Sequence, residues 1–109
     1  MELNKERMGK AVVVHVQGEV DASNVEEFKQ FLNGLMREED KLFVVDMSAL
    51  SFIDSSGIGA LVGFFKRVRL GEGDVRLAAL PDRIRKIFEL TRLDRVFTIY
   101  ENVKEAAEA

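Results

Sequence analysis

The sequence predicts one α/β domain with about five strands and four helices. The apolar residues switch several times between strand-like alternation and helix-like spacing along the 109 residues. A strand, a helix and another strand follow one another in the middle of the chain, which favours a parallel, right-handed crossover. Hydrophobic residues make up 47% and charged residues 32%, a balance typical of a folded chain with its own core. We therefore expect a single domain over residues 1–109.

The first elements are read from the amino-terminal third. In residues 11–17, Val12, Val14 and Val16 alternate with Val13, His15 and Gln17, which predicts a strand with one strongly apolar face. The polar stretch before it is expected to supply an edge strand. The segment Ser23-Asn24-Val25-Glu26 has the Ser-x-x-Glu form of a capping box, so a helix is expected to begin there. Its apolar pattern ends in the charged run 37–41, interpreted as a solvated connection.

The remaining elements follow the same logic. Residues 42–45 are apolar on both faces, which predicts a central strand ending at Asp46. Helical spacing after Ile58 predicts a second helix that stops near Leu70-Gly71. The later elements are a strand from Val75 to Leu80, a helix opened by Pro81-Asp82, a short strand over residues 96–100 and a final helix capped by Asn102.

The segment from Ser48 to Gly57 is the candidate functional site. It is interpreted as a loop leaving the carboxyl end of a parallel strand, where ligands and partners usually meet α/β proteins. Asp54, Ser55 and Ser56 are expected at or just before a helix N-terminus, where unpaired N–H groups favour negative charge. The simpler interpretation is that they only cap the helix. Two hydroxyls and a carboxylate, however, exceed what one cap needs.

Glycines and apolar residues around this segment point the same way. Gly57, Gly59 and Gly63 fall in or near the first two turns of the helix, each at a cost of about 1 kcal/mol relative to alanine when interior. Close approach of another backbone explains such glycines, and that backbone is either the neighbouring strand or a partner protein. Phe52 and Ile53 either fill the core or present an apolar contact, and at least one of them is expected in the core.

The stretch from Phe52 to Leu61, Phe-Ile-Asp-Ser-Ser-Gly-Ile-Gly-Ala-Leu, resembles the signature of STAS-domain anti-sigma factor antagonists. The resemblance extends through Gly18-Glu19-Val20-Asp21, Asp46-Met47-Ser48 and Thr91-Arg92-Leu93. Many family members have Thr-Gly-Leu at the last of these, and Leu or Ile in place of Val20. The family fold, a mixed sheet flanked by helices, agrees with the order of elements above.

The resemblance implies a regulatory switch. In the family the serine directly after the aspartate is the phosphoacceptor, here Ser55, and the residue matching Asp21 helps to contact the kinase. The unmodified protein is expected to bind a GHKL-type anti-sigma factor serine kinase and release the sigma factor. Phosphorylation ends this binding, and a serine phosphatase resets it. The expected partner-binding residues are Asp21, Ser23, Asn24, Asp54, Ser56, Gly57 and Ile58. The alternative is a STAS module acting as a subunit of another signalling or transport-associated assembly.

Other classes of function find little support in the residues. A net charge of -3 with mixed signs disfavours nucleic-acid binding. No apolar run approaches a membrane span and no signal core opens the chain, so we expect a cytoplasmic protein. The chain has no cysteine, and its one histidine with scattered carboxylates does not suggest a metal site. We expect no cofactor.

Two enzyme classes also lack support in the residues. The run from Gly57 to Gly63 superficially resembles a dinucleotide-binding loop, but about ten residues separate it from the expected end of the strand. A serine hydrolase would need a base, and His15, the only histidine, lies in a predicted strand away from any nucleophile motif. The chain is therefore not expected to be an enzyme.

Overall fold

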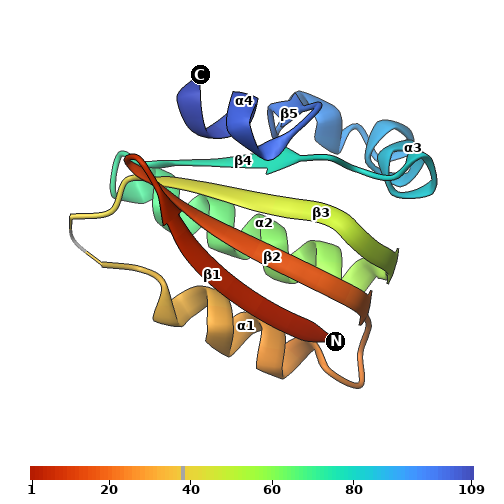
Figure 1. The fold of residues 1–109 in the computed structure, drawn as a ribbon. Coiled ribbons are helices and arrows are strands. Elements are labelled where there is room, and N and C mark those ends of the chain that lie inside the picture. The colour runs from red at the N-terminus through yellow and green to blue at the C-terminus, as the bar shows by residue number, and fades with distance from the viewer. Residues whose placement is uncertain (38) are drawn as a thin grey trace.

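The fold is built on one mixed sheet, seen in a computed structural model that describes residues 1–37 and 39–109 (Figure 1). The five strands lie in the order β1-β2-β3-β4-β5. Strand β1 is antiparallel to β2, and the other neighbouring pairs are parallel. The strands are β1 (Glu2–Met8), β2 (Ala11–Val20), β3 (Leu42–Ile53), β4 (Asp74–Ala78) and β5 (Ile99–Tyr100). The predicted α/β class and the edge strand before residue 11 are confirmed.

Helices cover the two faces of the sheet unequally. Helices α1 (Val25–Gly34) and α2 (Ser55–Leu70) lie side by side on one face, and α4 (Val103–Glu108) lies on the other (Figure 1). Helix α3 (Asp82–Leu90) and the short 3-10 helix η1 (Leu93–Arg95) connect β4 to β5. None of the helices formed by the described residues is long and apolar enough to cross a bilayer.

The larger core lies between the sheet and the α1/α2 layer. Val12, Val14 and Val16 of β2 face this layer, whereas Ala11 and Val13 face the smaller cluster under α4. This division follows from the two-residue period of a strand. Val44 and Val45 of β3 are buried on opposite faces, so the prediction of a strand covered on both sides is confirmed.

Strand β3 is longer than the sequence predicts. It continues to Ile53 instead of ending at Asp46, so most of the expected loop is paired with β2. Two register shifts explain the error, because each places one extra residue on β3. As a result Met47, Leu50 and Ile53 are buried at intervals of three residues, a spacing that the two-residue period of a strand does not fit.

The connection into α1 also differs from the prediction. The helix begins at Val25 after Asn24, and neither Ser23 nor Glu26 makes a capping-box bond. The Ser23 hydroxyl donates instead to the Asp21 carboxylate, two residues earlier. The Asn24 side chain accepts from the Asp21 amide and donates to the Glu19 carbonyl, which fixes the turn. The side chains of Ser23 and Asn24 thus bond to groups of the turn and not to the amides of the first helical turn.

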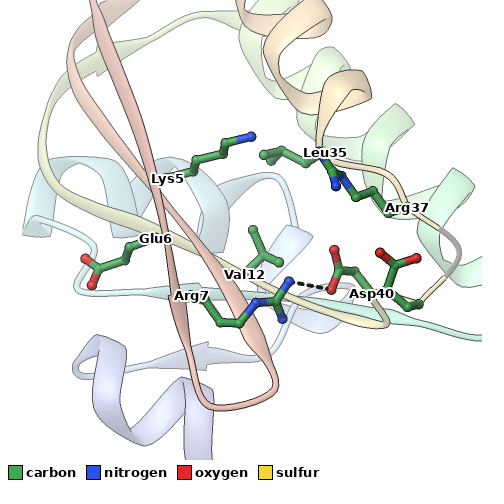
Figure 2. Close-up of a pocket in the computed structure, with 8 residues that line it drawn as sticks. Lys5, Glu6, Arg7, Val12, Leu35, Arg37 and Asp40 are labelled. Carbon is green, nitrogen blue, oxygen red and sulfur yellow. Dashed lines mark hydrogen bonds and ion pairs between the residues drawn. The ribbon is translucent and has the colours of Figure 1, made fainter.

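The charged run after α1 is only partly solvated. Glu38 lies outside the described residues. The Asp40 side chain is only 5% exposed and accepts from the Arg7 guanidinium at 2.8 Å, an ion pair that joins the connection to β1 (Figure 2). Strand β5 has two residues, fewer than predicted, because the amides of Val96 and Phe97 donate back to the Leu93 carbonyl in the turn that follows η1. The helix predicted after Asn102 is confirmed, with Asn102 accepting from the Glu105 amide.

Candidate functional site

Two chain segments emerge together where β2 and β3 end. Val20 and Ile53, the last residues of these parallel strands, are paired, and the amide of Asp54 donates to the Val20 carbonyl at 3.1 Å. Parallel strands deliver their following segments to the same sheet edge, on the right in Figure 1. The turn that begins at Asp21 and the start of α2 at Ser55 therefore form one surface.

The Asp54 carboxylate ties the two segments to each other. One oxygen accepts from the Gly57 amide at 3.0 Å and from the Ser56 hydroxyl at 2.6 Å, and the other accepts from the Ala22 amide at 3.1 Å. The Ser56 hydroxyl bond, followed by the Gly57 amide bond, lowers the pKa of Asp54 below its ordinary value. Asp54 is thus the N-cap that the sequence predicts. The sequence predicts unpaired N–H groups at this helix start, but they are not all unpaired, because the Gly57 amide already donates to Asp54.

Ser55 is exposed at the first position of α2, and its hydroxyl has no hydrogen-bond partner among the described residues. It differs in this from the other four serines of the chain. The hydroxyls of Ser23, Ser51 and Ser56 donate to neighbouring oxygens. The side chain of Ser48 interacts with the Asp46 carboxylate. Of the neighbouring Ser55 and Ser56, Ser56 is therefore part of the helix cap, whereas Ser55 is exposed to solvent.

The three glycines near the start of α2 have different surroundings. A Cβ on Gly57 would lie 2.7 Å from Ile53 Cγ1 and 2.9 Å from Val20 Cγ1, so close packing within the chain requires this glycine. A Cβ on Gly59 would meet nothing within 4 Å, and one on Gly63 would meet only Arg67, at 3.4 Å. Of the two explanations that the sequence leaves open, the neighbouring strand accounts for Gly57 alone. The surface of α2 next to Gly59, one turn after Ser55, is open.

The other predicted site residues lie on the same edge of the sheet. Asp21 and Asn24 are half-buried in the turn and bonded to it, while Ser23 is exposed. Ile58 is half-buried against the core. Ile53 is buried and Phe52 is 42% exposed beside this surface, which confirms that at least one of the two belongs to the core. Sequence reasoning missed Ala22, because a contribution from its backbone amide leaves no side-chain signal.

The structure corrects the predicted spacing between the central strand and the glycine-rich run that begins at Gly57. Strand β3 ends at Ile53, so three residues, not about ten, separate it from Gly57. The chemistry still argues against dinucleotide binding, because a pyrophosphate would need the first amides of α2. The Asp54 carboxylate accepts from the Gly57 amide and would repel such an anion.

His15 is held by two carboxylates on the sheet face away from α1 and α2. Its Nδ1 lies 2.6 Å from Asp46 Oδ2 and its Nε2 lies 2.6 Å from Glu6 Oε2. Burial opposes the charged ring, but the bonds to Asp46 and Glu6 outweigh it and raise the pKa of His15. Burial likewise opposes ionisation of Asp46, yet the Ser48 amide and His15 lower its pKa. With both ring nitrogens engaged, His15 does not serve Ser55 as a base.

The two carboxylates approach opposite sides of the His15 ring, so the three groups do not converge on one point. Within residues 1–37 and 39–109, no group of three or more acidic, histidine or cysteine side chains is placed to hold a metal ion.

Comparison with known proteins assigns the family. The STAS domain family model matches residues 2–106. An anti-sigma-B factor antagonist of Listeria monocytogenes is 33% identical over 95 residues, which cover 87% of this chain and 83% of that protein. A protein of the same name from Staphylococcus aureus is 28% identical over 91 residues, 84% of each chain. The chain therefore belongs to the STAS domain family.

Solved structures agree on the fold. An anti-sigma factor antagonist from Mycobacterium paratuberculosis superposes with a TM-score of 0.89 at 24% identity, over 98% of this chain and 91% of that one. The phosphorylated form of the Bacillus cell fate determinant SpoIIAA superposes with a TM-score of 0.75 at 23% identity, over 98% and 97%. These likenesses confirm the STAS-like mixed sheet.

Proposed function

We propose that this protein is an anti-sigma factor antagonist controlled by phosphorylation of Ser55. In the unmodified state it binds an anti-sigma factor that is also a serine kinase, and so releases a sigma factor. The phosphorylated state does not bind, and a serine phosphatase restores the unmodified state. The role is one of protein binding and not of catalysis by this chain, and it places the protein in the cytoplasm. The names of the relatives support the class, and the site geometry supports the residue.

The hydroxyl of Ser55 is the observation that carries the proposal. It is exposed at the start of α2 without a protein partner, while Ser56 beside it is bonded to Asp54. A kinase therefore meets one free hydroxyl on this surface. The open surface at Gly59, where an added Cβ would meet nothing within 4 Å, lets a partner backbone approach α2 closely.

The charge of a phosphate on Ser55 is by itself enough to weaken partner binding strongly, without a change of fold. A phosphate adds about 1.5 to 2 negative charges at neutral pH. It would join Asp54 and Asp21 on a surface where the Gly57 amide is already occupied. Burying that charge against a partner fitted to a neutral hydroxyl costs several kcal/mol of binding free energy. A hundredfold loss of affinity needs only about 2.7 kcal/mol.

Mass spectrometry tests the site directly. The protein is incubated with ATP and its cognate kinase, and we expect one phosphate, on Ser55. Ser55→Ala should abolish the modification, and Ser56→Ala, the matched control, should leave it in place. A phosphate on Ser56 or Ser23 of the native chain would refute the assignment.

Binding of the same variants tests the charge argument. Ser55→Ala is expected to bind the kinase like the unmodified protein, and Ser55→Asp to bind at least about tenfold more weakly, a loss of about 1.4 kcal/mol. Equal affinity of the two variants, measured by calorimetry, would show that charge at this position does not control binding.

A further inference from the structure

The serines around the start of α2 differ in what their hydroxyls contact. Ser23 and Ser56 each donate to the carboxylate of an aspartate two residues earlier, Asp21 and Asp54. Ser55 has no such partner among the described residues. Exposure does not separate Ser55 from Ser23, since both are exposed. Hydrogen bonding to an aspartate is therefore the property that distinguishes the other two serines from Ser55.

The carboxylate that Ser56 contacts is fixed in position. Asp54 Oδ1 accepts from the Ser56 hydroxyl at 2.6 Å and from the Gly57 amide at 3.0 Å, while Oδ2 accepts from the Ala22 amide at 3.1 Å. A rotation of this side chain away from Ser56 would leave two backbone N–H groups without their acceptor. Asp54 therefore stays next to Ser56 as long as the start of α2 and the turn after β2 remain folded.

Asp54 is also a weak base for Ser56. The Ser56 hydroxyl bond, followed by the Gly57 amide bond, lowers the pKa of the Asp54 carboxyl. A carboxylate whose pKa lies below its ordinary value has little tendency to take a proton at neutral pH. The contact therefore holds the Ser56 proton in a hydrogen bond and does not activate the oxygen as a nucleophile.

Phosphoryl transfer to Ser56 would break this contact. In the transfer, a base of the kinase takes the hydroxyl proton, the serine oxygen bonds to the γ-phosphorus of ATP, and the bond to the bridging oxygen breaks and releases ADP. The Ser56 oxygen would then have no proton to donate, so two acceptor oxygens would face each other across 2.6 Å. Rotation of Ser56 away from Asp54 avoids this repulsion but still loses the hydrogen bond. A hydrogen bond to a charged group is worth about tenfold to hundredfold in an equilibrium constant.

Modification of Ser55 leaves the Asp54 contacts intact. Ser55 contributes to none of the three hydrogen bonds of this carboxylate. A phosphate on Ser55 therefore keeps the cap of α2 and the link to the turn in place. The charge of Asp54 opposes a phosphate on either neighbouring serine, but only Ser56 also loses a hydrogen bond.

We propose that Asp54 determines which of the two adjacent serines is phosphorylated, by holding the Ser56 hydroxyl in a hydrogen bond and leaving Ser55 as the free nucleophile. This role of Asp54 rests on the proposed phosphorylation of Ser55 and adds the residue that selects it. Capping of α2 needs only the bond from the Gly57 amide. An Asp54 with a purely structural role would therefore affect stability but not the ratio of the two phosphorylated products.

Site-resolved mass spectrometry of Asp54→Gly tests the selection. Glycine is also a favoured N-cap, so the variant removes the acceptor of Ser56 at small cost to the helix. After incubation with ATP and the cognate kinase, the native chain should carry its phosphate on Ser55. In Asp54→Gly, the share of phosphate on Ser56 should rise by at least about tenfold. The ratio of the two products is measured because weaker docking of the kinase slows modification of both serines.

Three further variants isolate the effect. Ser55→Ala should accept no phosphate, whereas Ser55→Ala with Asp54→Gly should accept one on Ser56. Asp54→Asn keeps an N-cap oxygen but loses the charge, so it should raise the Ser56 share by a smaller factor, and it decides the question if Asp54→Gly does not fold. Glu19→Gln removes an exposed carboxylate near the end of β2 and should change the share less than about twofold.

The outcomes separate this proposal from the proposed function. Phosphate on Ser55 alone in both Asp54 variants would overturn the selection by Asp54. Phosphate on neither serine of these variants would also overturn it, because Asp54 would then be needed for modification itself and not for the choice of serine. Absence of phosphate from Ser55 of the native chain would instead refute the proposed function.

Discussion

Gly57 and Gly59 lie two residues apart on α2 and have different roles. Gly57 is required by packing, whereas Gly59 is not. We expect Gly57→Ala to lower the free energy of unfolding by about 1–3 kcal/mol, because its Cβ would overlap Ile53 and Val20. Gly59→Ala meets nothing within 4 Å and should raise it by about 0.5–1 kcal/mol through higher helix propensity. Urea unfolding of both variants measures the difference. A stable Gly57→Ala protein would contradict the packing argument.

Arg92 has a strained backbone conformation. It has φ +62° and ψ +19°, the left-handed conformation that glycine adopts without steric cost. We expect Arg92→Gly to stabilise the fold by about 0.5–1 kcal/mol, since relief of the backbone strain exceeds the added entropy of the unfolded chain. Arg95→Gly, within η1, is the control and should destabilise. Thermal unfolding distinguishes them, and a loss of stability in Arg92→Gly would disprove the strain.

At the scale of single residues, the sequence identifies the cap of α2 but not that of α1. Asp54 and Ser55 are predictable because a strand, an acceptor side chain and a helix follow in order. The capping box at Ser23 fails because the N-cap is Asn24, so Ser23 lies one position too early, in the turn where its hydroxyl donates to Asp21. Which hydrogen bonds the polar side chains of a turn form depends on the backbone path of the turn, and this path cannot be read from the local sequence.

Among the elements, β3 shows what periodicity leaves out. Its first half is apolar on both faces, as a strand covered on both sides should be, and is predicted, but its second half contains two extra residues relative to β2. Bulges of this kind depend on the partner strand, so a pattern search along one segment misses them. The consequence for the site is direct: what the sequence presents as a loop is paired strand up to Ile53.

His15 joins three strands, and its titration should therefore be visible in stability. Because its pKa is raised, the stability it contributes is fully present below about pH 6.5 and is lost as pH rises through the raised value. The pKa of Asp46 is lowered, so its contribution is present above about pH 3.8 and is lost as pH falls through the lowered value. The Glu6–His15–Asp46 contact is accordingly strongest between these two limits.

The test compares the native chain with His15→Gln in urea at pH 5.5 and pH 8.5, on either side of the ordinary histidine pKa. We expect the native chain to be the more stable at the lower pH, by about 1 kcal/mol or less, the size of partly exposed ion pairs. The advantage should shrink at the higher pH. An advantage that stays constant or grows with pH would contradict the assignment. The chain has no other histidine to confuse the comparison.

For the molecule as a whole, we expect phosphorylation to change the surface and leave the fold unchanged. Ser55 is exposed, and a negative group at the first turn of α2 is compatible with the helix dipole. Ser55→Asp should therefore alter the free energy of unfolding by less than about 1 kcal/mol. Calorimetry of the isolated protein checks this. A large loss of stability would mean that weaker partner binding reflects unfolding and not charge.

Strand β3 holds Ser55 two residues beyond its last paired position, and α2 begins at that serine. A modifying enzyme is thus unable to draw this stretch into a cleft as an extended, pliable chain. It has to recognise the assembled shape and bring its own catalytic groups to the hydroxyl. A free peptide of residues 48–62 should consequently be a poor substrate at concentrations where the intact protein is modified completely.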